Sequence, residues 1–582
     1  MYILGLQMGH ASTAALMKDG RIIAAVSQER FDRKKNSNAF PAEPIKWMLD
    51  FERITMDQVD AVAVSGLLFP FLEAGITSGV GTPSIISKVW GNVEYKTPTL
   101  RKGLDPAYKT YLKRISKKNQ NIAKRVLSER LKIDASKIHF VEHHVAHAYA
   151  AYYGMRNQEN KDNSLVLTLD GAGDYYCAGV NTTDNLNIKR IASTPLQHSL
   201  GFVYSQTTLF LGMKPLEHEY KVMGLAPYAK DYYLDTYNNI FKPLIDLNQD
   251  NPLIFEARFP TNRTLQYLKD NAVGVRFDNI SASVQHLAED LMTRWVKAVI
   301  KKTGIKDVFC GGGVFMNVKA NMKIMDIPEV EKLSVHPSCG DESNPFGAMY
   351  YLYINHFRNS PDKTKRIKDI YLGPEYSNDY IKEFIKKNNL EKKYHIEYVE
   401  EIEKKIAKMI ADGGIVARLA GRAEWGARSL GNRAILGHPS HMETFYRVND
   451  QIKMRDFWMP FAPTMLKERA DEYIDNPKGI EAPYMILAFR STEKGKKAFR
   501  AALHQGDHTL RPQVLEKSWN PGYYKIIKEF EKITGIGGIL NTSFNLHGEP
   551  LVDSPADAIH TMENSGLQHL AMENYLISKK EV

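Results

Sequence analysis

Two histidines at helical spacing stand out as residues whose type and position could perform chemistry. The stretch EHHVAHA places His143 and His147 four residues apart at the start of an apolar, helix-forming run. At that spacing two side chains share one face of a helix, which is how a helix offers two imidazole nitrogens to one metal ion. A pair of buried or helix-capping histidines is the alternative, and for an isolated HxxxH it is the more frequent outcome. Motifs elsewhere in the chain are needed to choose between a metal site and structural histidines.

Composition limits the classes of protein to which the chain can belong. Its 582 residues exceed what one hydrophobic core supports, so we expect two or more domains. The excess of 77 Lys and Arg over 67 Asp and Glu is small and scattered, and it does not predict a nucleic-acid partner. Three widely spaced cysteines favour a reducing compartment. Without a leader pattern or an apolar run of about 18 residues, we expect a cytoplasmic protein that has no membrane segment.

Repeated strand and turn patterns indicate the elements that must position these residues. Residues 2–30 alternate apolar runs with turns, which predicts three strands in succession. The pattern returns from residue 164, with 165–169 as the expected first strand and 170–173 as the first turn. Two copies predict a duplicated domain with a cleft between its halves. A third turn, CGGGVFMN, follows an apolar strand and precedes a helix, a layout that presents backbone N–H groups to phosphate.

A polar, proline-containing connector near residues 357–368 divides the chain. We place a first domain at 1–360 and a second domain at 368–582. Beyond the connector, YIKEFIKKNNL and EEIEKKIAKMIADGG have the pattern of amphipathic helices, and GIVARLAG that of a buried strand. The second domain is therefore also expected to be α/β.

A series of motifs along nearly the whole chain resembles the carbamoyltransferases of the NodU/CmcH type. In order, they are LVLTLDGAGD, EYKVMGLAPYA, CGGGVFMN, HPSCGDESNPFGA, GRAEWGARSLGNRAIL, MPFAPTML and NTSFNLHGEPLVDSPADA. Any one of them could arise by chance, whereas the ordered set is specific. The resemblance implies an α/β fold in which a duplicated, actin/Hsp70-like (Kae1-like) N-terminal domain precedes a YrdC-like C-terminal domain. The repeated strand pattern agrees independently with the first of these domains.

The same resemblance implies an enzyme that makes carbamoyl-adenylate from carbamoyl phosphate and ATP and passes the carbamoyl group to a hydroxyl. The acceptor would be a sugar or another small natural product, with no nucleic acid or membrane as partner and with a homodimer left open. A threonylcarbamoyl transferase acting on transfer RNA shares both domain types, but the motifs resemble those of the small-molecule enzymes. A non-enzymatic actin-like or Hsp70-like ATP-binding module would not explain an HxxxH with a distant aspartate.

In the first domain the resemblance implies a metal site and a nucleotide site. His143 and His147 match two metal ligands and Asp341 the third, with Asp170 as a fourth contact, directly or through water, while His144 points elsewhere. A mixed nitrogen and oxygen ligand set suits several divalent metals, of which Fe(II) is our first choice, with Mn, Zn or Mg as alternatives. The expected contacts to the nucleotide are Asp170, Gly312, Gly313, Asn317 and Lys221.

The remaining candidate residues would carry the two steps of the reaction. His10 is a candidate general base for the acceptor hydroxyl, and Lys35 matches a lysine near the carbamoyl-adenylate. In the second domain Arg428 is preferred to Arg422 and Arg433 because it matches the family's anion-binding arginine. The other contacts to carbamoyl phosphate or nucleotide would be Lys453, Arg511 and Ser543. For Lys221 and Glu219 a structural ion pair is an equal alternative, and residues 66–135 are expected to shape the acceptor side.

Overall fold

Two sheets with the same strand order form the first part of the chain in the computed structural model, which describes residues 1–67, 98–157 and 163–580. The first sheet has the order β3-β2-β1-β4-β5 and contains β1 (Tyr2–Gln7), β2 (Thr13–Lys18), β3 (Arg21–Ser27), β4 (Ala61–Ser65) and β5 (Ile138–Val141). The second has the order β12-β11-β6-β7-β8 and contains β6 (Leu165–Gly173), β7 (Tyr176–Asp184), β8 (Asn187–Pro195), β11 (Asp307–Gly311) and β12 (Lys332–Val335). In each sheet three consecutive strands are antiparallel and two later strands add in parallel, so the predicted repeat is present.

One detail of the second copy differs from the prediction. Residues 170–173, which we expected to form a turn, continue β6, and the pairing register with β7 shifts between Leu169 and Gly173. The chain turns at 174–175 instead, because Asp174 adopts the left-handed φ of 51°. Asp170 therefore lies in the extended end of a strand, where its side chain can reach the neighbouring helix.

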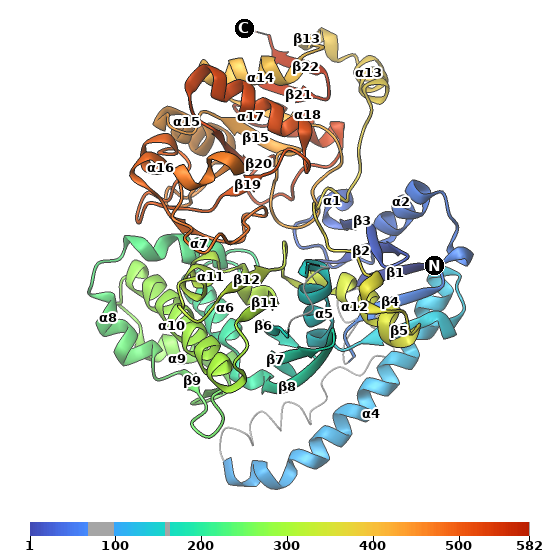
Figure 1. Ribbon diagram of the computed structural model, residues 1–582, viewed down its shortest axis with the longest axis vertical. Coiled ribbons are helices and arrows are strands. Elements are labelled where there is room, and N and C mark those ends of the chain that lie inside the picture. The colour runs from blue at the N-terminus through green and yellow to red at the C-terminus, as the bar shows by residue number, and fades with distance from the viewer. Residues whose placement is uncertain (68–97, 158–162, 581–582) are drawn as a thin grey trace.

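Two helices lie between the sheets (Figure 1), and the first of them carries two of the four candidate metal ligands, His143 and His147. Helix α5 (His143–Met155) starts directly after β5 and packs on β6 and β11, whereas α12 (Asn344–Tyr351) packs on β1 and β4. The two helices also contact each other. Alanines such as Ala15, Ala61 and Ala63 line the inner face of the first sheet, and their small side chains allow α12 to approach closely.

Larger side chains cover the outer face of the first sheet. Leu4, Leu6 and Leu16 pack there against α2 (Ala42–Glu52) and the end of α4 (Pro98–Leu131). This alternation of small inward and large outward residues follows from the two-residue period of a strand. Much of the segment 66–135 lies outside the described residues, so its expected role on the acceptor side stays a prediction.

The second part of the chain is built on one mixed sheet, whose strands run in colour from yellow to red in Figure 1. Its order is β13-β22-β21-β14-β15-β20-β16-β19, with β13 (Tyr394–Tyr398), β14 (Val416–Leu419), β15 (Arg433–Gly437), β16 (Ala462–Leu466), β19 (Gln513–Leu515), β20 (Gly538–Ser543), β21 (His569–Met572) and β22 (Tyr575–Lys579). The expected helices are α13 (Asn378–Lys387) and α14 (Ile402–Ala411), and α14 packs with α17 (Pro521–Thr534) on the sheet. The boundary placed between 360 and 368 falls in the segment that joins α12 to α13. None of the helices in the described ranges is both long and apolar enough to cross a membrane.

Candidate metal and anion sites

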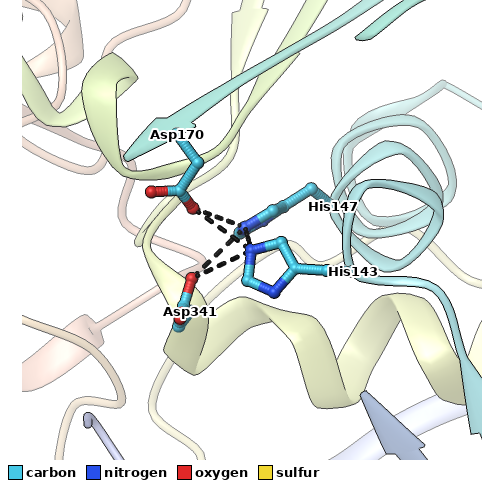
Figure 2. Close-up of side chains that lie close together, drawn as sticks. All are labelled: His143, His147, Asp170 and Asp341. Atoms are coloured by element: carbon cyan, nitrogen blue, oxygen red, sulfur yellow. Dashed lines mark hydrogen bonds and ion pairs between the residues drawn. The ribbon is translucent and has the colours of Figure 1, made fainter. Parts of the chain in front are cut away.

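Four side chains converge beside α5, at the end of β6 and the start of α12 (Figure 2). One ligand atom from each of His143, His147, Asp170 and Asp341, here called the metal cluster, lies within 4.8 Å of the others. The His147 Nε2 atom is 3.0 Å from Nε2 of His143 and 2.9 Å from Oδ2 of Asp170. Oδ1 of Asp341 lies 3.3 Å and 3.4 Å from the same two nitrogens. Two imidazole nitrogens and two carboxylates aimed at one point are a ligand set that a divalent metal would fit.

Backbone contacts fix the start of α5 and hence the two imidazoles. The Glu142 carboxylate caps the helix by accepting the N–H groups of His144 and Val145. Oδ2 of Asp174 accepts the His143 N–H at 2.9 Å. The His143 ring packs against Gly173, where a Cβ atom would lie only 2.0 Å from the ring, so no larger residue fits there.

The other ring nitrogens of the two candidate ligands have partners of their own. Nδ1 of His147 lies 3.4 Å from Oγ of Ser343, and Nδ1 of His143 lies 3.4 Å from the Asn344 amide. Oδ1 of Asn344 is buried without a hydrogen-bond partner among the residues that the structure describes, and exchanging the amide oxygen and nitrogen would let it accept the His143 Nδ1–H. Both rings would then carry the proton on Nδ1, which leaves Nε2 free to bind a metal.

His144 has a different environment, as the family match implies. Its Nδ1 lies 3.0 Å from the Thr168 hydroxyl, and its Nε2 lies 3.0 Å from the carbonyl oxygen of Tyr176. Burial holds its pKa well below 6.5, so the ring is neutral and both nitrogens are used by the fold. The metal cluster therefore contains only the first and last histidines of HHVAH.

The two carboxylates of the metal cluster favour positive charge at this site. Burial disfavours ionisation of Asp170, yet His143 and His147 lower the pKa of its carboxyl to about 2. Burial likewise opposes protonation of His143, but Asp341 and Asp170 raise its pKa well above 6.5. Without a metal the imidazoles bear this charge as protons, and a divalent cation would replace them.

His10 lies at the rim of the metal cluster. Its Nε2 is 3.3 Å from Oδ2 of Asp341, and its side chain is 42% exposed. The glycine turn after β11 also borders the cluster, since a Cβ on Gly313 would be 3.2 Å from Oδ1 of Asp170, while the Gly312 N–H donates to a backbone carbonyl. The side chain of Asn317 caps α11 (Val318–Met325) and bonds to Gln285.

A second group of side chains lies where the two parts of the chain meet. This cation cluster consists of Lys35, Lys221, Arg428, Lys453, Arg455 and Arg511. Burial lowers the pKa of Lys35, and the charges of Lys221 and Arg428 lower it further. Burial, Arg428 and Arg455 hold the pKa of Arg511 well below 12.5. Such mutual repulsion shows that these cations lie near one another, and an anion bound among them would relieve it.

Few of these cations have carboxylate partners. Lys221 pairs with Asp456 at 3.1 Å and is the only member that forms an ion pair with any described residue. Nζ of Lys453 donates to the Ser543 hydroxyl at 3.2 Å and to the Asn545 amide at 2.6 Å, so two of the residues expected to contact carbamoyl phosphate or nucleotide lie together. The expected alternative pair of Lys221 with Glu219 does not form. Glu219 accepts the Leu216 N–H instead.

The structure also separates the three arginines of GRAEWGARSLGNR. Arg433 is fully buried and donates to backbone carbonyls, including that of Pro374. Arg422 donates to the carbonyl of Leu372 and stacks on Phe51 at 4.6 Å. Among described residues Arg428 alone of the three has no hydrogen bond or ion pair, and its Nε is buried. Its guanidinium is therefore available to an anion.

Sequence reasoning missed the contacts that join the two parts. From the short helix α1 (Glu29–Asp32), Arg30 donates to the Gly426 carbonyl at 2.8 Å. Just after α1, Arg33 donates to the Leu551 carbonyl at 2.8 Å. The segment holds Lys35 beside the second part of the chain. Its only sequence signal was the density of basic residues in ERFDRKK, which by itself indicates a solvated surface.

Comparisons with known proteins agree with these two parts. The family model described as "Carbamoyltransferase N-terminus" matches residues 2–350, and "Carbamoyltransferase C-terminus" matches residues 407–579. The chain is 29% identical to nodulation protein NolNO of Sinorhizobium fredii, over 98% of this chain and 79% of that protein. It is 31% identical to the 3'-hydroxymethylcephem-O-carbamoyltransferase of Amycolatopsis lactamdurans, over 28% of this chain and 30% of that one. A HypF crystal structure aligns at a TM-score of 0.31 and 13% identity over 61% of this chain and 56% of that one, which is too weak for any inference.

The family assignment rests on both halves of the chain, since the two family models together cover most of it. The nodulation protein NolO of Bradyrhizobium diazoefficiens is a further relative, 30% identical over 76% of this chain and 79% of that protein. Carbamoyltransferases are enzymes, and the motifs, the family models and these relatives agree. The protein therefore belongs to the carbamoyltransferase family of the NodU/CmcH type.

Proposed function

We propose that the protein is an O-carbamoyltransferase that makes carbamoyl-adenylate from carbamoyl phosphate and ATP and transfers the carbamoyl group to a hydroxyl of a sugar or natural product. The observation that carries this proposal is that one chain of this family contains two polar clusters. One is rich in cations that, apart from Lys221, form no ion pair with a described residue, and the other has four convergent metal-type ligands. The relative named as a hydroxymethylcephem O-carbamoyltransferase supports an alcohol as the acceptor. We infer a small acceptor in the cytoplasm rather than nucleic acid.

The cation cluster would serve the first half-reaction. For the atoms to balance, water releases inorganic phosphate from carbamoyl phosphate, the resulting carbamate attacks the α-phosphorus of ATP, and pyrophosphate leaves. The guanidinium groups of Arg428 and Arg511 can each grip a phosphate through two parallel hydrogen bonds. Burial and the charge of Arg455 hold the pKa of Lys453 well below 10.5, and a bound phosphate would favour its charged form. These groups would be oriented before charge develops, which is how fixed donors lower a barrier.

The metal cluster would serve the transfer. The acceptor hydroxyl attacks the carbamoyl carbon, AMP leaves, and the hydroxyl proton passes to His10. The 42% exposure of His10 makes it reachable, and Asp341, at 3.3 Å, orients its ring. A divalent metal held by the four cluster residues, Fe(II) being our first choice, would supply positive charge for the phosphate of the leaving AMP.

The products of ATP test this proposal. With carbamoyl phosphate and α-labelled ATP we expect AMP and pyrophosphate, formed only when carbamoyl phosphate is present. Arg511→Ala should abolish pyrophosphate release, whereas Arg500→Ala, a change at an exposed position of the same part, should not. Formation of ADP, or transfer of the carbamoyl group without nucleotide, would show that the adenylate step is wrong. A panel of hydroxylated acceptors would then identify the natural product class.

A further inference from the structure

The loop that carries Arg428 is closed by one buried carboxylate. Oε1 of Glu424 accepts the backbone N–H groups of Leu430 at 2.8 Å, Asn432 at 2.7 Å and Arg433 at 3.2 Å. The glutamate is only 2% exposed. These bonds hold residues 424–433 as a compact unit, with Arg428 near its tip.

The tip of this loop is seated on the first part of the chain. Trp425 stacks on Phe346 of α12, with ring centroids 4.3 Å apart and planes at 27°. The Ala427 N–H donates to the Ser338 hydroxyl at 3.2 Å. Gly426 has a φ of 94°, and a Cβ there would lie 2.6 Å from Cβ of Ser338. Only glycine allows the loop to approach the turn so closely.

Ser338 belongs to the same turn as a candidate metal ligand. This turn runs from β12 to α12 and includes Asp341 of the metal cluster. The Ser338 hydroxyl accepts the Ala427 N–H while it donates to the half-buried carboxyl of Glu342, the neighbour of Asp341. Ala427 is followed directly by Arg428. A single hydroxyl thus connects the turn of the metal cluster to the backbone of an anion-binding arginine.

We propose that Ser338 is a positioning residue that couples the two clusters. Binding of a divalent metal fixes the turn around Asp341, and through Ser338 and Ala427 the same event fixes the backbone of Arg428. A phosphate at the cation cluster then binds more tightly, and by linkage it strengthens metal binding by the same factor. The coupling rests on the proposed function for the identity of the anion, but it requires no transfer reaction.

Metal and phosphate binding by the full-length protein test this coupling directly. The Kd of Mn²⁺ is measured from the electron paramagnetic resonance signal of the free ion, with and without saturating inorganic phosphate. In the wild type we expect phosphate to lower this Kd by about fivefold or more, the lower end of usual couplings. In Ser338→Ala the ratio of the Mn²⁺ Kd without phosphate to the Kd with phosphate should fall to about one. The Kd without phosphate should change by less than about twofold, because no metal ligand is removed.

Two further variants separate coupling from a loss of folding. Ser283→Ala removes another buried serine hydroxyl, on α10 (Phe277–Thr303), that bonds to the Asn279 carbonyl, and it should keep the wild-type ratio. Gly426→Ala forces the loop away from Ser338 and should lose the ratio, with intact folding checked by circular dichroism. An unchanged ratio in Ser338→Ala, or a wild type without phosphate-dependent Mn²⁺ binding, would overturn the proposal. If the wild type shows the expected ratio but transfers no carbamoyl group, the proposed function is refuted and the coupling is not.

Discussion

Glu424→Ala should free the loop around Arg428, whereas Glu424→Gln should largely preserve it. A hydrogen bond to a charged group contributes about 1.5–3 kcal/mol. Oε1 of Glu424 accepts three backbone N–H groups, but they share one oxygen, so we take about 3–4 kcal/mol for the set rather than the sum. This free energy corresponds to roughly 10²- to 10³-fold in the equilibrium for local opening. Glutamine keeps the accepting oxygen and alters only the position of Oε2, which has no hydrogen-bond partner within the described residues.

Hydrogen exchange of the amides of Leu430 and Asn432 measures this opening. In Glu424→Ala we expect exchange to accelerate by about 10²-fold or more, and in Glu424→Gln by less than about tenfold. Pyrophosphate release dependent on carbamoyl phosphate should fall with the first variant and persist with the second. If alanine leaves the two amides protected, the carboxylate does not hold the loop. If glutamine is as damaging as alanine, the negative charge matters and the accepted hydrogen bonds do not.

Two other changes test the metal cluster and the buried charges. His147→Ala should lose bound metal, as measured by elemental analysis, whereas His144→Ala should keep the metal and lose stability, because the His144 ring bonds to Thr168 and Tyr176. Metal loss in His144→Ala alone would contradict the ligand assignment. Burial raises the pKa of Asp553 from 3.8 to about 6, so the wild type loses stability as pH rises through this range, by about 3 kcal/mol in total from this group. Asp553→Asn should remove this loss of stability, so the urea midpoint should depend less on pH between about pH 4 and 6. If the pH dependence of the midpoint is the same as in the wild type, Asp553 ionises normally.

The parts of the fold that could be predicted are those encoded by short periodic patterns. The three-strand repeat follows from alternation and turn residues, and α5 follows from an apolar run with histidines at i and i+4. The extent of β6 could not be predicted, because DGAG is a common turn sequence. Here the segment is extended, with the turn moved to Asp174, whose carboxylate accepts the N–H groups of His143 and Leu67. Such long-range partners cannot be read from the turn itself.

The metal cluster was predictable only through the family motifs. His143 and His147 share a local pattern, but Asp170 and Asp341 come from a strand end and a distant turn, and no periodicity connects them. The motifs also distinguished Arg428 from Arg422 and Arg433, which local composition could not do. In the structure that distinction has a physical basis, because the guanidinium groups of Arg422 and Arg433 donate hydrogen bonds to backbone carbonyls.

The junction between the two parts could not be predicted, and the reason lies in the chemistry of its contacts. Arg30 and Arg33 donate to backbone carbonyls, which every residue possesses. The carboxylates that also pair with Arg33, those of Glu549 and Asp557 at 3.5 Å each, lie far along the chain, so no local pattern marks the partner segments. Yet this junction has direct consequences for the site. Lys35 follows α1 closely, so the contacts that seat α1 on the second part also bring Lys35 toward Arg428. Because the cation cluster takes members from both parts, each contact at the junction contributes to the arrangement of the side chains that we propose to bind an anion.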